Sequence, residues 1–275
     1  MRPITVRVAC VQLRARPASE AEHALHDALA GVTASAARGA QIAVLPECTY
    51  PGYVLLQRAL PGGERAVDRA LAAVATAARR HRIDVCIGVA RRGDDGALRN
   101  ESYYIDRDGD VVARYAKIFL WNFDGRWFTA GRDVRAFDTA FGRLGMMICA
   151  DGRMPEIART LARRGAWLIL DPTAWVGTGP AYARMPNPQV EYLMRVRARE
   201  NGVWIAAADK CGSERDVVHY VGNSMIVAPD GAIAASAGAA DPAIVVADVR
   251  VRRSARPVVV PVTPLERRAP RIGPC

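Results

Sequence analysis

The sequence predicts a single-domain α/β protein in which helices cover largely buried sheets. Apolar, β-rich segments alternate along the chain with segments of helical periodicity. The strand-like segments, such as 41–47 and 166–171, are almost continuously apolar, as in sheets covered on both faces. Two hairpin-like segments of similar design turn at Asp108-Gly109 and at Asp230-Gly231 and close two βαβ-type halves, which indicates an internal pseudo-repeat.

Each expected element has a local reason in the sequence. Strands are expected where β-rich apolar runs occur, at 6–13, 41–47, 84–92, 144–149, 166–171 and 203–209, with hairpins at 102–115 and 223–236. Helices are expected where apolar residues recur on one face, at 20–38, 64–82, 155–165 and 189–202. In the helix at 155–165, for example, Ile157 and Leu161 share a face and Gly165 ends the helix.

We expect residues 1–250 to form one domain, because no Ser/Gly-rich linker divides them. Residues 251–275 are rich in proline and arginine, and we expect an extended tail that either wraps a partner subunit or stays loose; the apolar VVVPV run favours a subunit interface.

Composition excludes several classes of protein. The net charge is +10, but the basic residues are spread along the chain without a nucleic-acid motif, so we expect no nucleic-acid partner. No apolar run reaches the roughly 20 residues of a membrane span, and the N-terminus lacks a signal peptide, so a cytoplasmic protein is expected. The six cysteines show no CxxC and no regular spacing, and neither a disulfide framework nor a zinc site is predicted.

The use of lysine is more informative. Of the 38 basic residues only Lys117 and Lys210 are lysines. In an arginine-rich chain, a lysine can be retained at a position where a compact amine with an adjustable pKa is needed. For Lys210, which follows the expected strand 203–209, we consider either simple exposure or contact with a substrate carboxylate at a pocket rim.

Three potentially reactive groups follow or close expected strands: Glu47, Lys117 and Cys149. In α/β sheets, ligands bind beyond such strand ends. A partly desolvated carboxylate can act as a general base, a thiol as a nucleophile and an ammonium as an oxyanion stabiliser. Each of the three residues, taken by itself, fits an ordinary structural role as well as a catalytic one, and a free cysteine is usually a buried core residue. Together they supply what acyl transfer requires.

The segments LPE (45–47), YAK (115–117) and CADGRMPEIAR (149–159) resemble the three catalytic motifs of the nitrilase superfamily of carbon–nitrogen hydrolases. RARENG (197–202) and GNSMIVAPDG (222–231) also resemble family segments, so the resemblance covers nearly the whole chain. It implies a four-layer αββα sandwich, no metal or organic cofactor, and a homodimer or larger homo-oligomer. It also implies Glu47 as base, Lys117 as oxyanion stabiliser and Cys149 as nucleophile.

Details within the motifs favour amide over nitrile chemistry. Asp151 stands where true nitrilases carry a glutamate, and CADGRMPEIAR is similar to the version in aliphatic amidases and formamidases. Many family members have a second glutamate between the lysine and the cysteine, and Asp124 is the nearest match here, either as a catalytic residue that places the attacking water or as a polar turn residue beside Gly125. Ala130 and Ala150 also depart from the family pattern, and they leave the substrate open.

The sequence therefore predicts an amidase that converts a small carboxylic amide to acid and ammonia through a Cys149 thioester. Trp121, Ala150 and Trp175 are expected to contact the substrate, with core packing as the alternative for the tryptophans. An N-carbamoyl-amino-acid amidohydrolase is the alternative within the enzyme class. An inert binding or scaffold protein on the same fold is the alternative from another class.

Overall fold

The computed structural model describes residues 5–55, 60–177, 187–216 and 218–250. The tail expected at 251–275 lies outside the described residues.

Within these residues the strands form two sheets. Nine strands form the first sheet: β1 (Thr5–Arg14), β2 (Ile42–Val44), β3 (Asp84–Arg92), β4 (Leu98–Ile105), β5 (Val111–Ala116), β9 (Val176–Gly177), β11 (Lys210–Glu214), β12 (Val218–Val221) and β15 (Ala243–Arg250). Six described strands form the second sheet: β6 (Ala136–Thr139), β7 (Gly142–Met146), β8 (Leu168–Pro172), β10 (Trp204–Ala208), β13 (Met225–Val227) and β14 (Ile233–Ser236).

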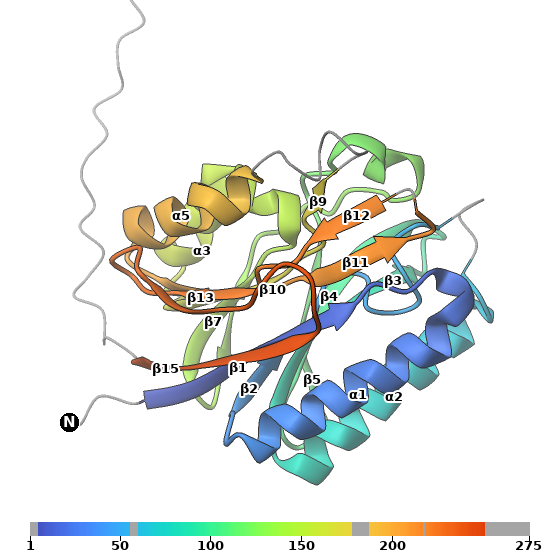
Figure 1. Cartoon of the computed structure of the whole chain (residues 1–275), viewed down its shortest axis with the longest axis horizontal. Coiled ribbons are helices and arrows are strands. Elements are labelled where there is room, and N and C mark those ends of the chain that lie inside the picture. Colours follow the sequence, from blue (N-terminus) through green and yellow to red (C-terminus); the bar gives the residue numbers. More distant parts are fainter. Residues whose placement is uncertain (1–4, 56–59, 178–186, 217, 251–275) are drawn as a thin grey trace, which may run out of the picture.

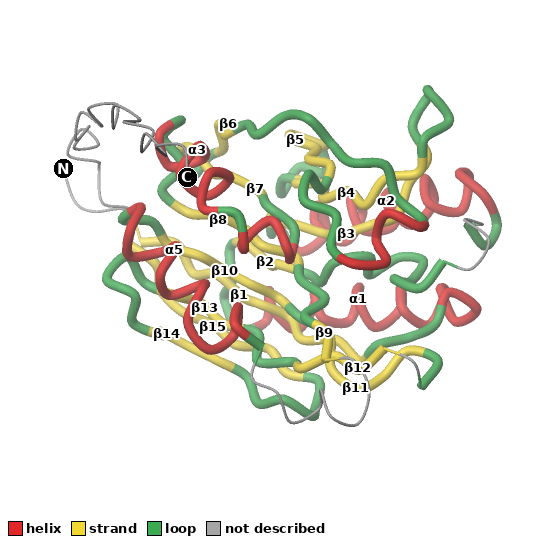
Figure 2. Tube along the Cα trace, turned by 90° about the horizontal axis from the view of Figure 1, so that it is seen from above, coloured by secondary structure: helices red, strands yellow, loops and turns green. Residues whose placement is uncertain are grey.

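Helices cover the outer face of each sheet. On the first sheet lie α1 (Ala21–Ala37) and α2 (Gly63–His81), and on the second lie α3 (Pro155–Arg163) and α5 (Met194–Asn201), on opposite sides of the molecule (Figures 1 and 2). Four shorter helical segments complete the description: η1 (Ala18–Glu20), η3 (Asn122–Arg126), η4 (Cys149–Arg153) and the π-helical η5 (Gln189–Leu193). The layers are therefore α, β, β, α, and the predicted fold class is confirmed.

The alternation of side chains along β1 separates two cores. Val8 and Cys10 point between the sheets and belong to a cluster that also contains Met146 and Leu170 of the second sheet. Ala9 and Val11 point the other way, into a cluster with α1 and α2. Burying a valine side chain stabilises by about 1.5–3 kcal/mol, so both faces of the strand contribute. This two-sided burial explains why the strand sequences are continuously apolar.

Both sheets repeat one pairing pattern. In the first sheet β1, β2 and β3 are parallel neighbours, followed by the antiparallel hairpin β4–β5. In the second, β7, β8 and β10 are parallel neighbours, followed by the antiparallel pairs β10–β13 and β13–β14. The expected hairpins at 102–115 and 223–236 thus occupy equivalent positions in the two halves.

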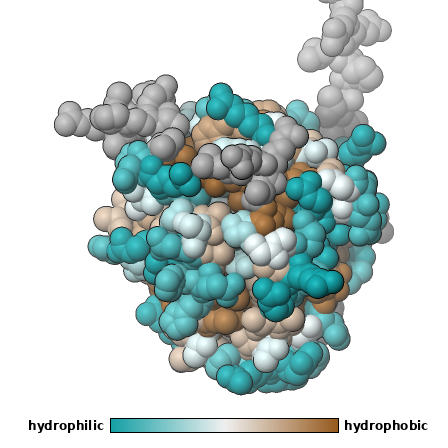
Figure 3. All heavy atoms as spheres, turned by 90° about the vertical axis from the view of Figure 1, so that its right-hand side faces the viewer, coloured by the Kyte–Doolittle hydropathy of each residue, from teal (hydrophilic) through white to brown (hydrophobic). Residues whose placement is uncertain are grey.

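The sequence did not predict five strands: β6, β9, β11, β12 and β15. Of these five, β15 forms the longest pairing. It runs antiparallel to β1, with Thr5 opposite Arg250 at one end and Gln12 opposite Ala243 at the other. Its sequence, AIVVADVR, is largely apolar, but most of its side chains are only partly buried, unlike those of the central strands. Figure 3 shows a face on which hydrophilic residues predominate and apolar residues form small scattered areas.

Gly88 of β3 lies close to the backbone of Glu47, and its substitution tests this close approach. A Cβ on Gly88 would lie 2.6 Å from Cα of Glu47 and 2.8 Å from the backbone N of Cys48. We expect Gly88→Ala to destabilise the fold by about 1–3 kcal/mol, because backbone must move to admit the methyl group. Thermal or denaturant unfolding measures this. Gly238→Ala is the control, since nothing lies within 4 Å of its added Cβ. Equal stability of the two variants would contradict the close approach of β3 to Glu47.

Candidate active site

Lys117 is the centre of a buried charge cluster. It directly follows β5, and its Nζ lies 2.7 Å from Oε1 of Glu47 and 2.6 Å from Oδ2 of Asp124. Lys117 is 1% exposed and the two acids are fully buried. Burial alone would lower the pKa of Lys117, but Glu47 and Asp124 outweigh it and hold the pKa well above its usual value. Lys117 is therefore an ammonium shielded from water.

Glu47 lies three residues beyond β2, at the carboxyl end of that strand. Its Oε1 also accepts a hydrogen bond of 2.5 Å from Nδ2 of Asn100, and its backbone N donates to the carbonyl of Thr173. Its Oε2 has no hydrogen-bond partner among the described residues. Burial raises the pKa of Glu47, and Lys117 acts in the opposite direction. The carboxylate is thus anchored by one oxygen and has the other available to accept a proton.

Asp124 lies on η3 and is the second acid in contact with Lys117. Both of its oxygens are occupied: Oδ1 accepts the hydroxyl of Tyr53 at 2.5 Å, and Oδ2 accepts Lys117 and the backbone N–H of Trp121. The ring of Tyr53 also lies 5.9 Å from the Lys117 ammonium. The structure therefore brings Asp124 to the lysine, and a role of Asp124 in catalysis stays a prediction.

The sequence had predicted that Cys149 is the last residue of a strand, and this prediction is wrong. The strand β7 ends at Met146, and Cys149 begins the turn η4 with a positive φ of 50°. Cys149 is 6% exposed, and burial followed by the charge of Glu47 raises the pKa of its thiol well above the usual value, while Lys117 lowers it. The resting cysteine is a neutral thiol close to both charges. A proton must therefore leave when it reacts.

Asp151 connects the cysteine turn to the lysine loop. Its Oδ1 accepts the backbone N–H groups of Ile118 and Phe119, and its Oδ2 accepts the N–H of Ile148 and the hydroxyl of Tyr115. From the sequence, Asp151 was interpreted only as a residue that distinguishes amide from nitrile chemistry. Its four donors show that it also ties the segments on either side of Lys117 and Cys149 together.

The three residues expected to contact the substrate differ in surroundings. Trp121 is half-buried, and the guanidinium of Arg153 lies 5.1 Å from its ring centroid. Ala150 is buried within η4. Trp175 is 1% exposed and belongs to the core between the sheets, which corresponds to the alternative of core packing. Contact with a substrate remains a prediction for all three.

Lys210 is not exposed, so the first of the two roles considered for it from the sequence is wrong, whereas contact with a substrate carboxylate stays a prediction. It is the first residue of β11, is 4% exposed and donates to the carbonyl of Cys48 at 3.0 Å. Glu214 lies on the same strand, and its carboxylate accepts the backbone N–H groups of Tyr53 and Val54. This pair therefore supports the loop that follows Glu47 and carries Tyr53.

Sequence reasoning missed Asn100, Tyr53 and Glu214. A signal existed for Tyr53, which follows LPE closely in the aromatic stretch YPGY, but neither Asn100 nor Glu214 stands in a recognisable motif. These residues are brought to the site by β4, the loop after β2 and β11, so only the fold reveals them.

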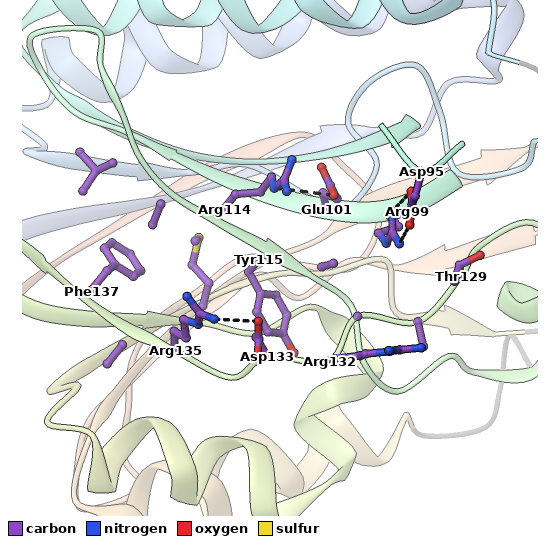
Figure 4. A pocket seen from close by; sticks show the side chains of 17 residues that line it. Asp95, Arg99, Glu101, Arg114, Tyr115, Thr129, Arg132, Asp133, Arg135 and Phe137 are labelled. Carbon is purple, nitrogen blue, oxygen red and sulfur yellow. Dashed lines mark hydrogen bonds and ion pairs between the residues drawn. The ribbon is translucent and has the colours of Figure 1, made fainter. Parts of the chain in front are cut away.

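A cavity of about 730 Å³ lies beside β4, β5 and the segment that leads into β6 (Figure 4). Ion pairs line it, such as Arg99 with Asp95 and Arg135 with Asp133. Its lining contains Tyr115, whose hydroxyl holds Asp151, but none of Glu47, Lys117 and Cys149. This cavity is therefore not lined by the candidate catalytic groups.

A comparison of the chain with known protein families agrees with this arrangement of acid, ammonium and thiol. A family model described as carbon-nitrogen hydrolase matches residues 7–256. The chain belongs to the carbon–nitrogen hydrolase family. It is thus a hydrolase that acts on C–N bonds, and the alternative of an inert scaffold is not supported.

Relatives of this carbon–nitrogen hydrolase are amidases and related hydrolases. It is 35% identical over 243 residues to "Hydrolase in pqqF 5'region" of Pseudomonas protegens, covering 85% of this chain and 79% of the relative. It is 30% identical to omega-amidase NIT2 of Homo sapiens, covering 80% of each chain. The crystal structure of an amidase from Nesterenkonia sp. superposes with a TM-score of 0.81 at 28% identity, covering 91% of this chain and 92% of that one. A variant of that amidase carries acrylamide added to its active-site cysteine.

No helix in the described part of this hydrolase is long and apolar enough to cross a membrane. Five cysteines of that part, Cys10, Cys48, Cys86, Cys149 and Cys211, are free and buried.

Asp151 gives a pH-dependent prediction. Burial raises the pKa of its carboxyl from 3.8 to about 6. The folded state holds this proton to higher pH than the unfolded chain, so the stabilisation is complete below about pH 4 and is lost as pH rises through about 6. The shift corresponds to about 3 kcal/mol. We therefore expect the stability difference between the wild type and Asp151→Asn to change by about that amount between pH 4 and 7, in favour of the variant at pH 7. Urea unfolding across this range measures it, and a difference independent of pH would contradict the protonation of Asp151.

Proposed function

We propose that this hydrolase cleaves a small carboxylic amide to the acid and ammonia through a thioester on Cys149. The observation that carries the proposal is the buried Lys117 ammonium, held by Glu47 and Asp124 beside a thiol in a left-handed turn. The names of the relatives, among them an omega-amidase and an amidase, support amide chemistry. Michael addition of acrylamide to the active-site cysteine in a variant of that amidase supports cysteine as the nucleophile.

Attack begins with proton transfer from Cys149 to Glu47. The raised pKa of both groups keeps the thiol protonated at rest and makes the carboxylate a better proton acceptor than an exposed glutamate. The free Oε2 accepts the proton as sulfur forms a bond to the amide carbon. The carbonyl π electrons move to oxygen and create a tetrahedral oxyanion.

Lys117 stabilises that oxyanion. Its charge is already in place and partly desolvated, so little reorganisation is needed when negative charge develops. The backbone N–H of Ala150, the residue after the nucleophile, is the second donor. Because both oxygens of Asp124 are engaged, we assign Asp124 to holding Lys117 rather than to placing water.

Collapse of the tetrahedral intermediate breaks the C–N bond. Glu47 returns its proton to nitrogen, ammonia leaves, and the acyl group stays on sulfur. Water then attacks the thioester while Glu47 takes one of its protons, and a second tetrahedral intermediate collapses to acid and free thiol. Glu47 thus acts twice as base and twice as acid.

A second candidate is an N-carbamoyl-amino-acid amidohydrolase, whose substrate carries a carboxylate. Arg153 is the observation in its favour. It lies four residues after Cys149 and its guanidinium packs over Trp121, near the lysine loop. A cation at that place suits a carboxylate-bearing amide or carbamoyl compound.

Replacement of the nucleophile tests the mechanism. We expect Cys149→Ala to abolish ammonia release, because the proposed thioester forms on the Cys149 thiol, while the fold is retained. Mass spectrometry of the wild type during turnover should find the acyl group on Cys149. Cys211→Ala, which removes another buried thiol, is the control and should keep turnover. Ammonia release that survives in Cys149→Ala would refute the thioester.

The substrate class is tested with Arg153→Gln on paired substrates. For a short neutral amide we expect KM to change less than about twofold. For a matched amide or carbamoyl compound with a distal carboxylate we expect KM to rise about tenfold or more, because a charged hydrogen bond is lost. Steady-state ammonia release measures both. An equal change for the two substrates would remove Arg153 as the carboxylate site.

A further inference from the structure

Both peptide groups that flank the Cα of Cys149 are held by buried side chains from other elements. The N–H of Cys149 donates to Oδ1 of Asp171 at 2.7 Å, and its carbonyl accepts from Nε2 of Gln189 at 2.7 Å. Asp171 lies in β8 and Gln189 begins η5, and both are fully buried. The nucleophile is thus fixed from two sides by residues that the mechanism above does not use.

These two hydrogen bonds determine the backbone conformation of Cys149. A non-glycine residue with a φ of 50° is rare and persists only where its surroundings impose it. One bond orients the peptide plane before Cα and the other the plane after it. Together they set φ and ψ, and hence the direction in which the thiol leaves the backbone.

The bond from Gln189 has a second consequence. In a planar trans peptide the carbonyl and the following N–H point in opposite directions. Gln189 holds the carbonyl of Cys149, so it also orients the N–H of Ala150. The N–H of Cys149 itself is engaged by Asp171, so the donor left for an oxyanion in this turn is that of Ala150.

We propose that Asp171 and Gln189 are positioning residues: Asp171 directs the Cys149 thiol, and Gln189 aims the Ala150 N–H at the oxyanion. The proposal rests on the thioester mechanism above. The two residues touch the backbone of the nucleophile and not the substrate.

The surroundings of each residue support these roles. Oε1 of Gln189 accepts from Nε of Arg153, which fixes the amide with its NH₂ toward Cys149. Oδ2 of Asp171 is buried and has no partner among the described residues. Burial also raises the pKa of Asp171, so a neutral carboxyl can accept the Cys149 N–H without placing negative charge beside the thiol.

Asp209 provides a matched control for Asp171. It follows β10, the neighbour of β8, and is equally buried. Its Oδ1 accepts a backbone N–H at 2.8 Å, and its Oδ2 also lacks a partner among the described residues. Its donor is Trp175 rather than Cys149, so it shares the structural role of Asp171 without contact to the nucleophile.

Gln189→Glu tests the aim of the Ala150 N–H. It keeps the shape and the acceptor for Arg153 but removes the donor to Cys149. We expect kcat for amide hydrolysis to fall about 10- to 100-fold, with KM changed less than about twofold, because oxyanion stabilisation is weakened. Alkylation of Cys149 by iodoacetamide displaces iodide at a CH₂ group and forms no oxyanion. Its plateau rate at high pH, which is independent of any shift in the thiol pKa, should therefore stay within about twofold of wild type. An unchanged kcat, or an equal fall in both rates, would overturn the role of Gln189.

Asp171→Leu tests the direction of the thiol. We expect the plateau alkylation rate to fall about tenfold or more, since thiol placement affects any reaction of sulfur. Asp171→Asn keeps an acceptor oxygen and should restore the rate to within about threefold of wild type. Asp209→Leu should lower Tm but leave the alkylation rate within about twofold. Equal alkylation rates in Asp171→Leu and Asp209→Leu, or an Asn variant as slow as the Leu variant, would overturn the role of Asp171.

Failure of this inference is distinguishable from failure of the proposed function. Alkylation reports the placement of Cys149 whether or not an amide is turned over. A wild type that hydrolyses no amide would refute the proposed function, whereas normal alkylation and kcat in the Asp171 and Gln189 variants would refute only the positioning roles.

Discussion

The burial of the Lys117 ammonium between Glu47 and Asp124 is the constraint on which the rest of the site depends. A charge removed from water is tolerated only with close, well-oriented partners, and loss of one partner from a buried pair costs about 3–5 kcal/mol. Lys117 has two carboxylate partners within 2.7 Å. Two segments distant in sequence, the one that carries Glu47 and the one that carries Lys117 and Asp124, must therefore converge, and the four-layer fold provides the interior in which they do.

The neighbours of this cluster hold it without adding exposed charge. Asn100 and Tyr53 each donate to one of the acids, and Asp151 joins the lysine loop to the turn of Cys149. Behind Tyr53, Glu214 holds the loop by its backbone N–H groups, and Lys210 holds the carbonyl of Cys48. Such pre-organisation is what electrostatic catalysis requires, since dipoles that are already aligned need not reorganise during the reaction.

The fold and the three central candidates were largely readable from the sequence. Glu47, Lys117 and Cys149 follow apolar segments in recognisable motifs, and the scarcity of lysine drew attention to Lys117. The scarcity of lysine also drew attention to Lys210 but did not predict its buried position, because an unusual residue type indicates a special environment but not which one. The strands missed, such as β11 and β15, have half-buried or polar faces, and their pairing partners lie far away in the chain.

The sequence by itself determined the α/β class, the order of its helices and central strands, and the residue types available for acyl transfer, because periodicity and motifs are local properties. The tertiary structure decided that Cys149 begins a left-handed turn, that Asp124 has no free oxygen, and that Asp171 and Gln189 hold the nucleophile. These are matters of distance between segments far apart in the chain, such as the 22 residues between Cys149 and Asp171 and the 71 residues between Tyr53 and Asp124. No local pattern encodes such distances, because they arise only when the two sheets pack together.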